Sequence, residues 1–135
     1  MSGKKIVRAE DVMKSDFVEV DGLMTVAQAL DIARESRARV LIVKKRHEDD
    51  EFGMVLLSDI AKKVIACDRS ADRVNVYEIM AKPTIGVKGR MDVRYCARLF
   101  ENVGISLAPV IDEDQIRGIV SYNDIVLDGL FAEQQ

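Results

Sequence analysis

The chain has 135 residues, of which 48% are hydrophobic and 32% charged, and its formal net charge is −3. This composition is typical of a soluble globular protein with one compact domain or two very small ones, and it excludes a disordered chain. The acidic balance, with basic residues spread along the sequence, argues against nucleic acid as a partner.

The first long helix is predicted to begin at Thr25. Thr25 and Gln28 have the spacing of a capping box, in which each side chain bonds the other residue's backbone N–H. Four apolar residues then recur on one helical face: Val26, Ala29, Leu30 and Ala33. We therefore expect an amphipathic helix that buries this face.

Two apolar runs, Val40–Val43 and Gly53–Leu57, come next and predict an antiparallel hairpin. The charged turn between them contains the single histidine, His47, beside several acidic residues. Because no second imidazole or thiolate is near, we interpret this turn as a solvated tip and predict no metal site. A second helix should follow, with an inner face formed by Ile60, Ala61, Val64 and Ile65.

The whole pattern occurs twice. Met13 corresponds to Met80, an offset of 67 residues, and after the hairpin turn Gly53 corresponds to Gly118, an offset of 65. In the second copy, the first helix is predicted to begin at Asp92 and to end at Gly104. The inner face of this helix is formed by Val93, Cys96, Ala97 and Phe100. Two strands follow, Leu107–Ile111 and Ile116–Val120. The inner face of the final helix is formed by Ile125, Val126 and Leu130.

The repeat predicts an α/β (α+β) chain built from two pseudo-symmetric β-α-β-β-α units. We assign residues 1–70 to the first repeat and residues 71–135 to the second. The period exceeds the roughly 20 to 50 residues of stacked repeat arrays, so we expect a closed pair rather than a solenoid.

Two segments of the second copy, Ala108–Asp112 and Gly118–Ile125, resemble the hallmark segments of the cystathionine-β-synthase (CBS) domain family. Their counterparts in the first copy are Leu41–Val43 and Gly53–Ile60. In order, spacing and duplication the chain is similar to a stand-alone tandem pair of CBS domains, or Bateman module. The resemblance implies two units packed through their sheets, clefts for adenosine nucleotides between them, and frequent dimerisation.

Ser121 and Asp124 are the main site candidates. Ser121 should lie where a strand ends and a helix begins, so its hydroxyl and the first free backbone N–H groups would favour a phosphate. Asp124, one turn further on, offers two acceptor oxygens to the hydroxyls of a ribose. The alternative is that both residues only cap the helix, which stabilises it by ~0.3 to 1 kcal/mol without any ligand.

The resemblance also implies an adenine slot with apolar walls, formed by Thr84, Ile85, Val87, Ala108, Pro109 and Val110. The first copy departs from the pattern, because Leu56 occupies the position of Ser121 and removes its hydroxyl. Asp59 could still hold a ribose there, or Ser58 and Asp59 could serve only as helix-start residues. We therefore expect the second-repeat site to bind more tightly.

No catalytic constellation is present in the sequence. It contains no nucleophile elbow and no phosphate-binding glycine loop, and its one imidazole lies in an exposed turn, so we expect no enzyme and no catalytic cofactor. The leading hypothesis is a regulatory sensor for an adenosine-type ligand such as AMP, ADP or ATP, read by an unidentified protein target. The alternative is a ligand-free dimerisation or scaffold module.

A homodimer is expected from the apolar C-terminal residues Ile125, Leu127, Leu130 and Phe131 and from methionines near the helices: Met13, Met24, Met80 and Met91. No apolar run approaches the ~18 residues of a membrane span, and no export signal is evident. Cys67 and Cys96 lie outside any C-x-x-C motif, which suits a reduced cytoplasm.

Overall fold

The computed structural model describes residues 5–130 and divides the chain into two compact α+β units. One unit is formed by residues 16–84, and the other combines residues 5–15 with residues 85–130. This division differs from that of the sequence repeats, 1–70 and 71–135, because the leading segment of each repeat packs on the other repeat.

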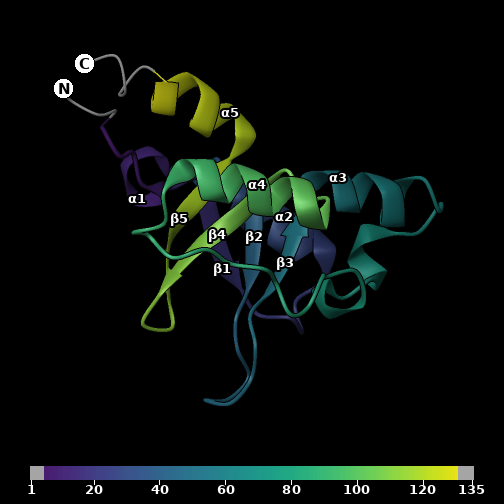
Figure 1. The fold of residues 1–135 in the computed structure, drawn as a ribbon. Coiled ribbons are helices and arrows are strands. Elements are labelled where there is room, and N and C mark those ends of the chain that lie inside the picture. Colours follow the sequence, from purple (N-terminus) through teal and green to yellow (C-terminus); the bar gives the residue numbers. More distant parts are fainter. Residues whose placement is uncertain (1–4, 131–135) are drawn as a thin grey trace. The chain divides into compact units, whose positions relative to one another are not determined.

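The unit of residues 16–84 is a three-stranded sheet with strand order β1-β2-β3 and two main helices (Figure 1). β1 is parallel to β2, and β2 is antiparallel to β3, which confirms the predicted hairpin. Its elements in chain order are β1 (Phe17–Val20), α2 (Val26–Ser36), β2 (Val40–Val43), β3 (Gly53–Leu56), α3 (Leu57–Ile60), the π-helical turn η1 (Ala61–Ile65), and the 3-10 turns η2 (Ala71–Arg73) and η3 (Val76–Glu78).

Helix α2 begins at a capping box and ends at a residue in the left-handed conformation. Thr25 Oγ1 accepts a hydrogen bond from Gln28 N at 3.1 Å, and Gln28 Oε1 accepts one from Thr25 N at 3.0 Å, so the capping box is confirmed. The helix ends at Arg37, which adopts the left-handed conformation. The predicted face lies in the core: Val26, Ala29 and Ala33 are buried, and Leu30 packs against them.

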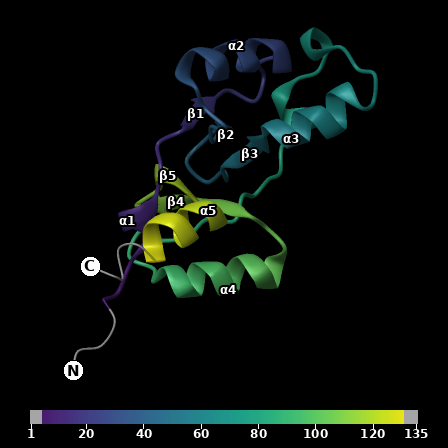
Figure 2. The same ribbon diagram turned by 90° about the horizontal axis from the view of Figure 1, so that it is seen from above.

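The second unit has a two-stranded antiparallel sheet formed by β4 (Leu107–Asp112) and β5 (Gln115–Ser121). The expected first strand is reduced to one parallel bridge, in which Val87 N donates to Pro109 O and Ile111 N donates to Val87 O. Helix α4 and the final helical segment lie side by side in this unit (Figure 2). The remaining elements are α1 (Ala9–Val12), α4 (Val93–Val103), α5 (Tyr122–Asp124) and the π-helical turn η4 (Ile125–Gly129).

Helix α4 confirms the second set of helix signals. Asp92 accepts a hydrogen bond from Arg94 N at 2.8 Å, and the helix ends at Gly104 with φ 75°. Phe100 is fully buried and contacts Tyr122 edge-to-face, with ring centroids 5.4 Å apart. Val93 and Cys96 are buried beside it, while Ala97 is half-buried at the margin.

The leading segments of the two repeats are exchanged. Val93 N donates to Val7 O at 2.9 Å, and at the equivalent place Val26 N donates to Val74 O at 2.8 Å. The same correspondence continues two residues on, where Ala9 N donates to Met91 O and Val76 N donates to Met24 O. Residues 5–15 therefore complete the unit that contains the second repeat.

The final helical segment of each repeat buries only part of the predicted face. Ile60 and Val64 lie in the core, but Ala61 and Ile65 are exposed, Ile65 by 72%. In the second copy Ile125 packs against the core, whereas Val126 and Leu130 are exposed by 52% and 53%. Neighbouring helical residues differ by about 100° in direction. Ala61, Ile65 and Val126 each follow a residue that faces the core, so their own side chains point away from it. The prediction was wrong for these three residues and for Leu130.

The methionines expected to offer exposed apolar surface are partly buried instead. Met24 and Met80 pack against the core of one unit, and Met13 and Met91 against the core of the other. The exposed apolar residues of the C-terminal segment are Val126, Leu127 and Leu130, while Phe131 lies outside the described residues. The four methionines therefore offer less exposed apolar surface than the sequence suggested.

The turn of the second hairpin is tighter than that of the first. Nine residues, 44–52, connect β2 to β3, whereas only Glu113 and Asp114 connect β4 to β5. These two residues have φ values of 50° and 63°, the left-handed conformation that a two-residue type I′ hairpin turn requires. The two-residue contraction between the repeats lies within the hairpin, between Val43 and Gly53 in the first copy and between Val110 and Gly118 in the second, where the strands are also longer.

Candidate functional site

Ser121 and Asp124 lie at the junction of β5 and α5 in a closed hydrogen-bonded arrangement. Ser121 Oγ donates to Asp124 Oδ2 at 2.9 Å and accepts from Asp124 N at 3.2 Å. Ser121 N donates to the same carboxylate oxygen at 3.2 Å. Both residues are about nine-tenths buried, at 8% exposure each. The two residues therefore form a capping box at the start of α5.

This arrangement leaves one carboxylate oxygen for a ligand. Within residues 5–130, Asp124 Oδ1 has no hydrogen-bond partner, and it is not among the fully buried atoms. The Ser121 hydroxyl, in contrast, already donates to Asp124. A contact between Ser121 and a phosphate would require that hydrogen bond to break, so the role of Ser121 in this arrangement is to hold Asp124 in place.

The first copy holds its carboxylate less firmly. Leu56 N donates to Asp59 Oδ2 at 2.8 Å, which reproduces the backbone half of the arrangement. Because Leu56 has no hydroxyl, the side-chain half is missing. Asp59 is half-buried, and Ser58 is exposed at the helix surface. The two repeats therefore place an aspartate at the same position, but Ser121 gives Asp124 two hydrogen bonds and Leu56 gives Asp59 only one.

Most of the expected adenine-slot residues lie in the same unit as Ser121. Ala108 pairs with Val120 beside it, and Val87 is bridged to Val110. Val87, Ala108 and Val110 are buried side chains of the unit's core, and Pro109 is also buried in β4. Their side chains are occupied by packing, which leaves mainly backbone atoms to face a ligand.

The other two expected slot residues lie in the segment that joins the units. Thr84 is the last residue of the unit 16–84, where its N–H donates to Phe52 O at 3.0 Å and its hydroxyl contacts Met54 Sδ. Ile85 begins the other unit and is exposed.

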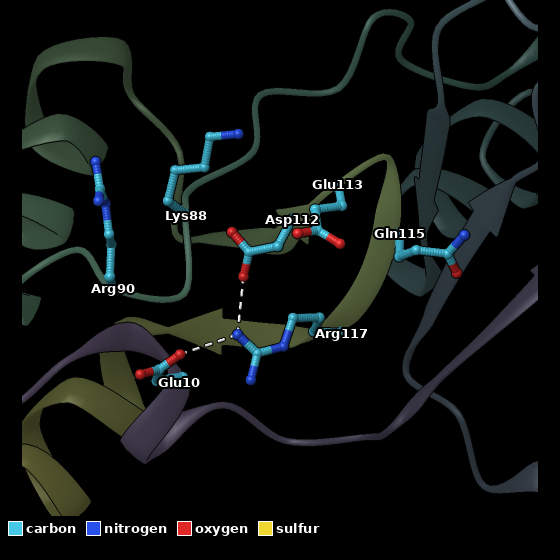
Figure 3. A pocket seen from close by; sticks show the side chains of 7 residues that line it. All are labelled: Glu10, Lys88, Arg90, Asp112, Glu113, Gln115 and Arg117. Atoms are coloured by element: carbon cyan, nitrogen blue, oxygen red, sulfur yellow. Dashed lines mark hydrogen bonds and ion pairs between the residues drawn. The ribbon is translucent and has the colours of Figure 1, made fainter.

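A separate open depression of about 700 Å³ lies at the opposite end of the β4–β5 hairpin (Figure 3). Arg117 points between two carboxylates on its floor, with Nη1 2.9 Å from Glu10 Oε1 and 2.8 Å from Asp112 Oδ2. The hydrogen bond from Arg117 holds the pKa of Asp112 below its usual range, and the same acids raise the pKa of Arg117. Lys88 and Arg90 line the other side of the depression.

Sequence patterns missed this depression because its residues come from three distant segments without a shared motif. Its acids and bases balance one another, and Arg117 Nη1 is already bonded to Glu10 and Asp112. Two further basic residues that could approach a phosphate are also paired: Arg39 with Asp16, and Lys82 with Asp50.

The described part of the chain, residues 5–130, brings no three His, Cys, Asp or Glu side chains together as a metal site. Over the same residues, no helix is both long and apolar enough to cross a membrane.

Comparison with known proteins identifies the repeated unit. Residues 9–66 and 76–128 each match the family model described as the CBS domain. The hexameric CBS-CP12 protein from bloom-forming cyanobacteria is similar to this chain with 40% identity and a TM-score of 0.88, covering 95% of this chain and 74% of that one.

Two more distant relatives extend the comparison. An uncharacterized protein of Methanopyrus kandleri is 29% identical over 101 residues, which cover 73% of this chain; the chain spans about half, 52%, of that curated relative. The CBS domain pair of protein MJ0100, solved in complex with 5′-methylthioadenosine and S-adenosyl-L-methionine, has 22% identity and a TM-score of 0.76, covering 97% of this chain and all of that one. This last likeness shows the fold.

Proposed function

Because the chain belongs to the CBS domain family and carries two copies of the domain, we propose that it is a non-catalytic sensor module for an adenosine-containing ligand. The second-repeat site is the stronger one in this proposal. Asp124 accepts hydrogen bonds from the ribose hydroxyls, and backbone atoms around Val87 and Ala108–Val110 contact the adenine ring.

The observation that carries the proposal is the state of the Asp124 carboxylate. A carboxylate that is 8% exposed is costly to bury, and one of its oxygens has no partner within residues 5–130. Two donors from Ser121 fix its orientation. A ligand with two adjacent hydroxyl groups would supply the missing hydrogen bonds without moving the carboxylate.

The adenosine class of ligand draws support from a structural neighbour. The CBS domain pair of protein MJ0100 binds 5′-methylthioadenosine and S-adenosyl-L-methionine, two ligands that share an adenosine group and lack a phosphate. That chemistry agrees with a site in which Ser121 supports the carboxylate rather than binding phosphate. AMP, ADP and ATP share the same adenosine group and belong to the proposed class.

Signalling in this proposal follows from linkage. A ligand that prefers one arrangement of the two repeats shifts the equilibrium toward it by its differential affinity, and a protein target reads the arrangement. The module acts as a homodimer through the exposed apolar residues of its final helical segments, such as Ile65 and Leu127, which are 72% and 70% exposed. We place the module in the cytoplasm.

A ligand-free scaffold is the second candidate function. The exposed apolar residues favour it, as does the hexameric state of the CBS-CP12 relative at 40% identity. In this case the helical faces serve assembly alone, and Asp124 and Ser121 are only helix-start residues.

A ligand screen separates the two functions. Purified protein is tested by thermal shift and calorimetry with adenosine, AMP, ATP and S-adenosylmethionine, with guanosine and ribose 5-phosphate as controls. Binding to the native state alone raises the melting temperature with ligand concentration. A saturable shift with the adenosine compounds and no turnover supports the sensor, and no shift with any of them favours the scaffold.

A further inference from the structure

The segment that leaves the unit 16–84 runs along the outer strand of its sheet. Met54 and Ala81 exchange two backbone hydrogen bonds of 2.9 Å, and Thr84 N donates to Phe52 O at 3.0 Å. The approach is close: a β carbon at Gly53 would lie 2.8 Å from Met80 Sδ. We call residues 80–84 the crossover segment, because the chain passes from one unit to the other directly after it.

A partly buried ion pair ties the crossover segment to the tip of the first hairpin. Lys82 Nζ lies 2.8 Å from Asp50 Oδ1 and 2.9 Å from Asp50 Oδ2. The Asp50 side chain is 8% exposed and that of Lys82 22% exposed. Arg46 adds two donors to the same carboxylate, its backbone N at 2.9 Å and Nε at 3.1 Å. Such a carboxylate is stable when buried only because donors surround it.

The second repeat has the same strand geometry, but the carboxylate Asp112 beside its hairpin tip bonds other partners. Lys14 exchanges backbone hydrogen bonds with Ile119 of β5, at the position equivalent to Ala81 and Met54. The hairpin tip there has only two residues, and the nearby Asp112 is bonded to Arg117 and Gly89 N. The longer tip of the first hairpin is thus what supplies a carboxylate to the crossover segment.

We propose that Asp50 and Lys82 form a latch that holds the crossover segment on β3 and thereby fixes the chain entering the second-repeat site. The segment ends at Thr84, and the chain continues directly into Ile85 and Val87; all three are expected ligand contacts. The effect on the ligand rests on the proposed function, whereas the holding of the segment does not. Lys82 and Asp50 are positioning residues and do not touch the ligand.

Hydrogen exchange tests the latch without a ligand. The amides of Ala81 and Thr84 donate to Met54 O and Phe52 O, so their exchange reports detachment of the segment. Lys82→Met and Asp50→Asn should each accelerate both amides about tenfold or more, because each removes the ion pair that joins the segment to the hairpin tip. The double variant should exchange no faster than the faster single variant, since the two residues act together.

The matched control is Arg69→Met, which breaks an ion pair with Glu78 in the same unit whose side chains are 41% and 32% exposed. It should leave the exchange of Ala81 and Thr84 unchanged. Unfolding midpoints measured in parallel separate local detachment from global destabilisation. Wild-type exchange rates at Ala81 and Thr84 in both folded single variants would overturn the latch.

Calorimetry with AMP tests the effect on the site. Lys82→Met should weaken binding at least about fivefold, while Arg69→Met binds like the wild type. Faster exchange with unchanged AMP affinity would show that the latch does not affect ligand binding at the second-repeat site, and the sensor function would remain intact. If the wild type binds none of the adenosine compounds, the sensor function fails, and the exchange rates still decide whether the latch exists.

Discussion

Gly53 and Gly118 occupy equivalent positions in the two units, and each lets a segment from the start of a repeat pass close to a hairpin strand. A β carbon at Gly53 would lie 2.8 Å from Met80 Sδ, and one at Gly118 would lie 2.9 Å from Met13 Cγ. At Gly118 the backbone oxygen of Lys14 is also only 3.0 Å away. The glycine that begins each hallmark segment is therefore a packing requirement of the fold.

The first prediction concerns these glycines. Gly118→Ala should lower the free energy of unfolding by about 1 to 3 kcal/mol, because the Lys14 backbone cannot yield as a methionine side chain can. Gly53→Ala should cost less, since its nearest neighbour is the flexible Met80. Gly129→Ala is the control, with its nearest neighbour at an ordinary 3.7 Å. Urea denaturation measures all three, and equal stability of Gly118→Ala and Gly129→Ala would contradict the packing argument.

The second prediction concerns pH. Hydrogen bonds from Lys82, and then from Arg46, lower the pKa of Asp50. A carboxyl with a lowered pKa in the folded state stabilises the protein above its ordinary pKa of about 4, and this contribution is lost as the pH falls further. The difference in unfolding free energy between wild type and Asp50→Asn should be constant from about pH 6 to 8 and shrink below about pH 4. A difference that grows on acidification would refute the assignment.

The third prediction concerns the two cysteines. Burial, and then the charge of Asp92, raise the pKa of Cys96 to about 11, while Cys67 is exposed. The thiolate is the reactive form, so iodoacetamide at about pH 8 should modify Cys67 at least a hundredfold faster than Cys96 in the folded protein. Mass spectrometry of the digested protein gives both rates. Equal rates under native conditions would show that the core of the unit does not cover Cys96.

The fourth prediction concerns assembly. Ile65→Glu and Leu127→Glu should each weaken dimerisation at least about tenfold without lowering the monomer's stability, because both side chains are exposed. Tyr95→Glu, at an exposed position of α4, is the control. Sedimentation equilibrium measures the dissociation constants. A wild-type monomer at high micromolar concentration would rule out the homodimer.

Much of the fold follows from local sequence signals. The Thr25–Gln28 capping box, Asp92, Gly104 and the hairpin strands depend on neighbouring residues, so their patterns survive in the sequence. The exchange of the leading segments leaves no such signal, because the two copies begin alike and either partner satisfies the same pattern. The exposure of Ile65 was also missed, since an apolar residue in a helix pattern does not reveal whether a second layer covers it.

The sequence predicted the proximity of Ser121 and Asp124 but not the geometry of their contact. Ser121 and Asp124 lie together as expected, yet the direction of the Ser121 hydroxyl depends on three-dimensional geometry. The ion pairs were beyond sequence reasoning, because they join residues far apart: 107 positions for Glu10 and Arg117, and 32 for Asp50 and Lys82.

The most direct test of the sensor function is a calorimetric titration of AMP into the wild type, Asp124→Ala and Asp59→Ala, with Ser121→Ala as a fourth protein. Loss of a hydrogen bond to a charged group costs ~1.5 to 3 kcal/mol, so Asp124→Ala should weaken the tighter binding step about tenfold to a hundredfold. Ser121→Ala should weaken the same step by a smaller factor, and Asp59→Ala should leave it nearly unchanged. Equal losses from Asp124→Ala and Asp59→Ala in folded proteins would contradict the asymmetry, and wild-type affinity in Asp124→Ala would show that its carboxylate only caps the helix.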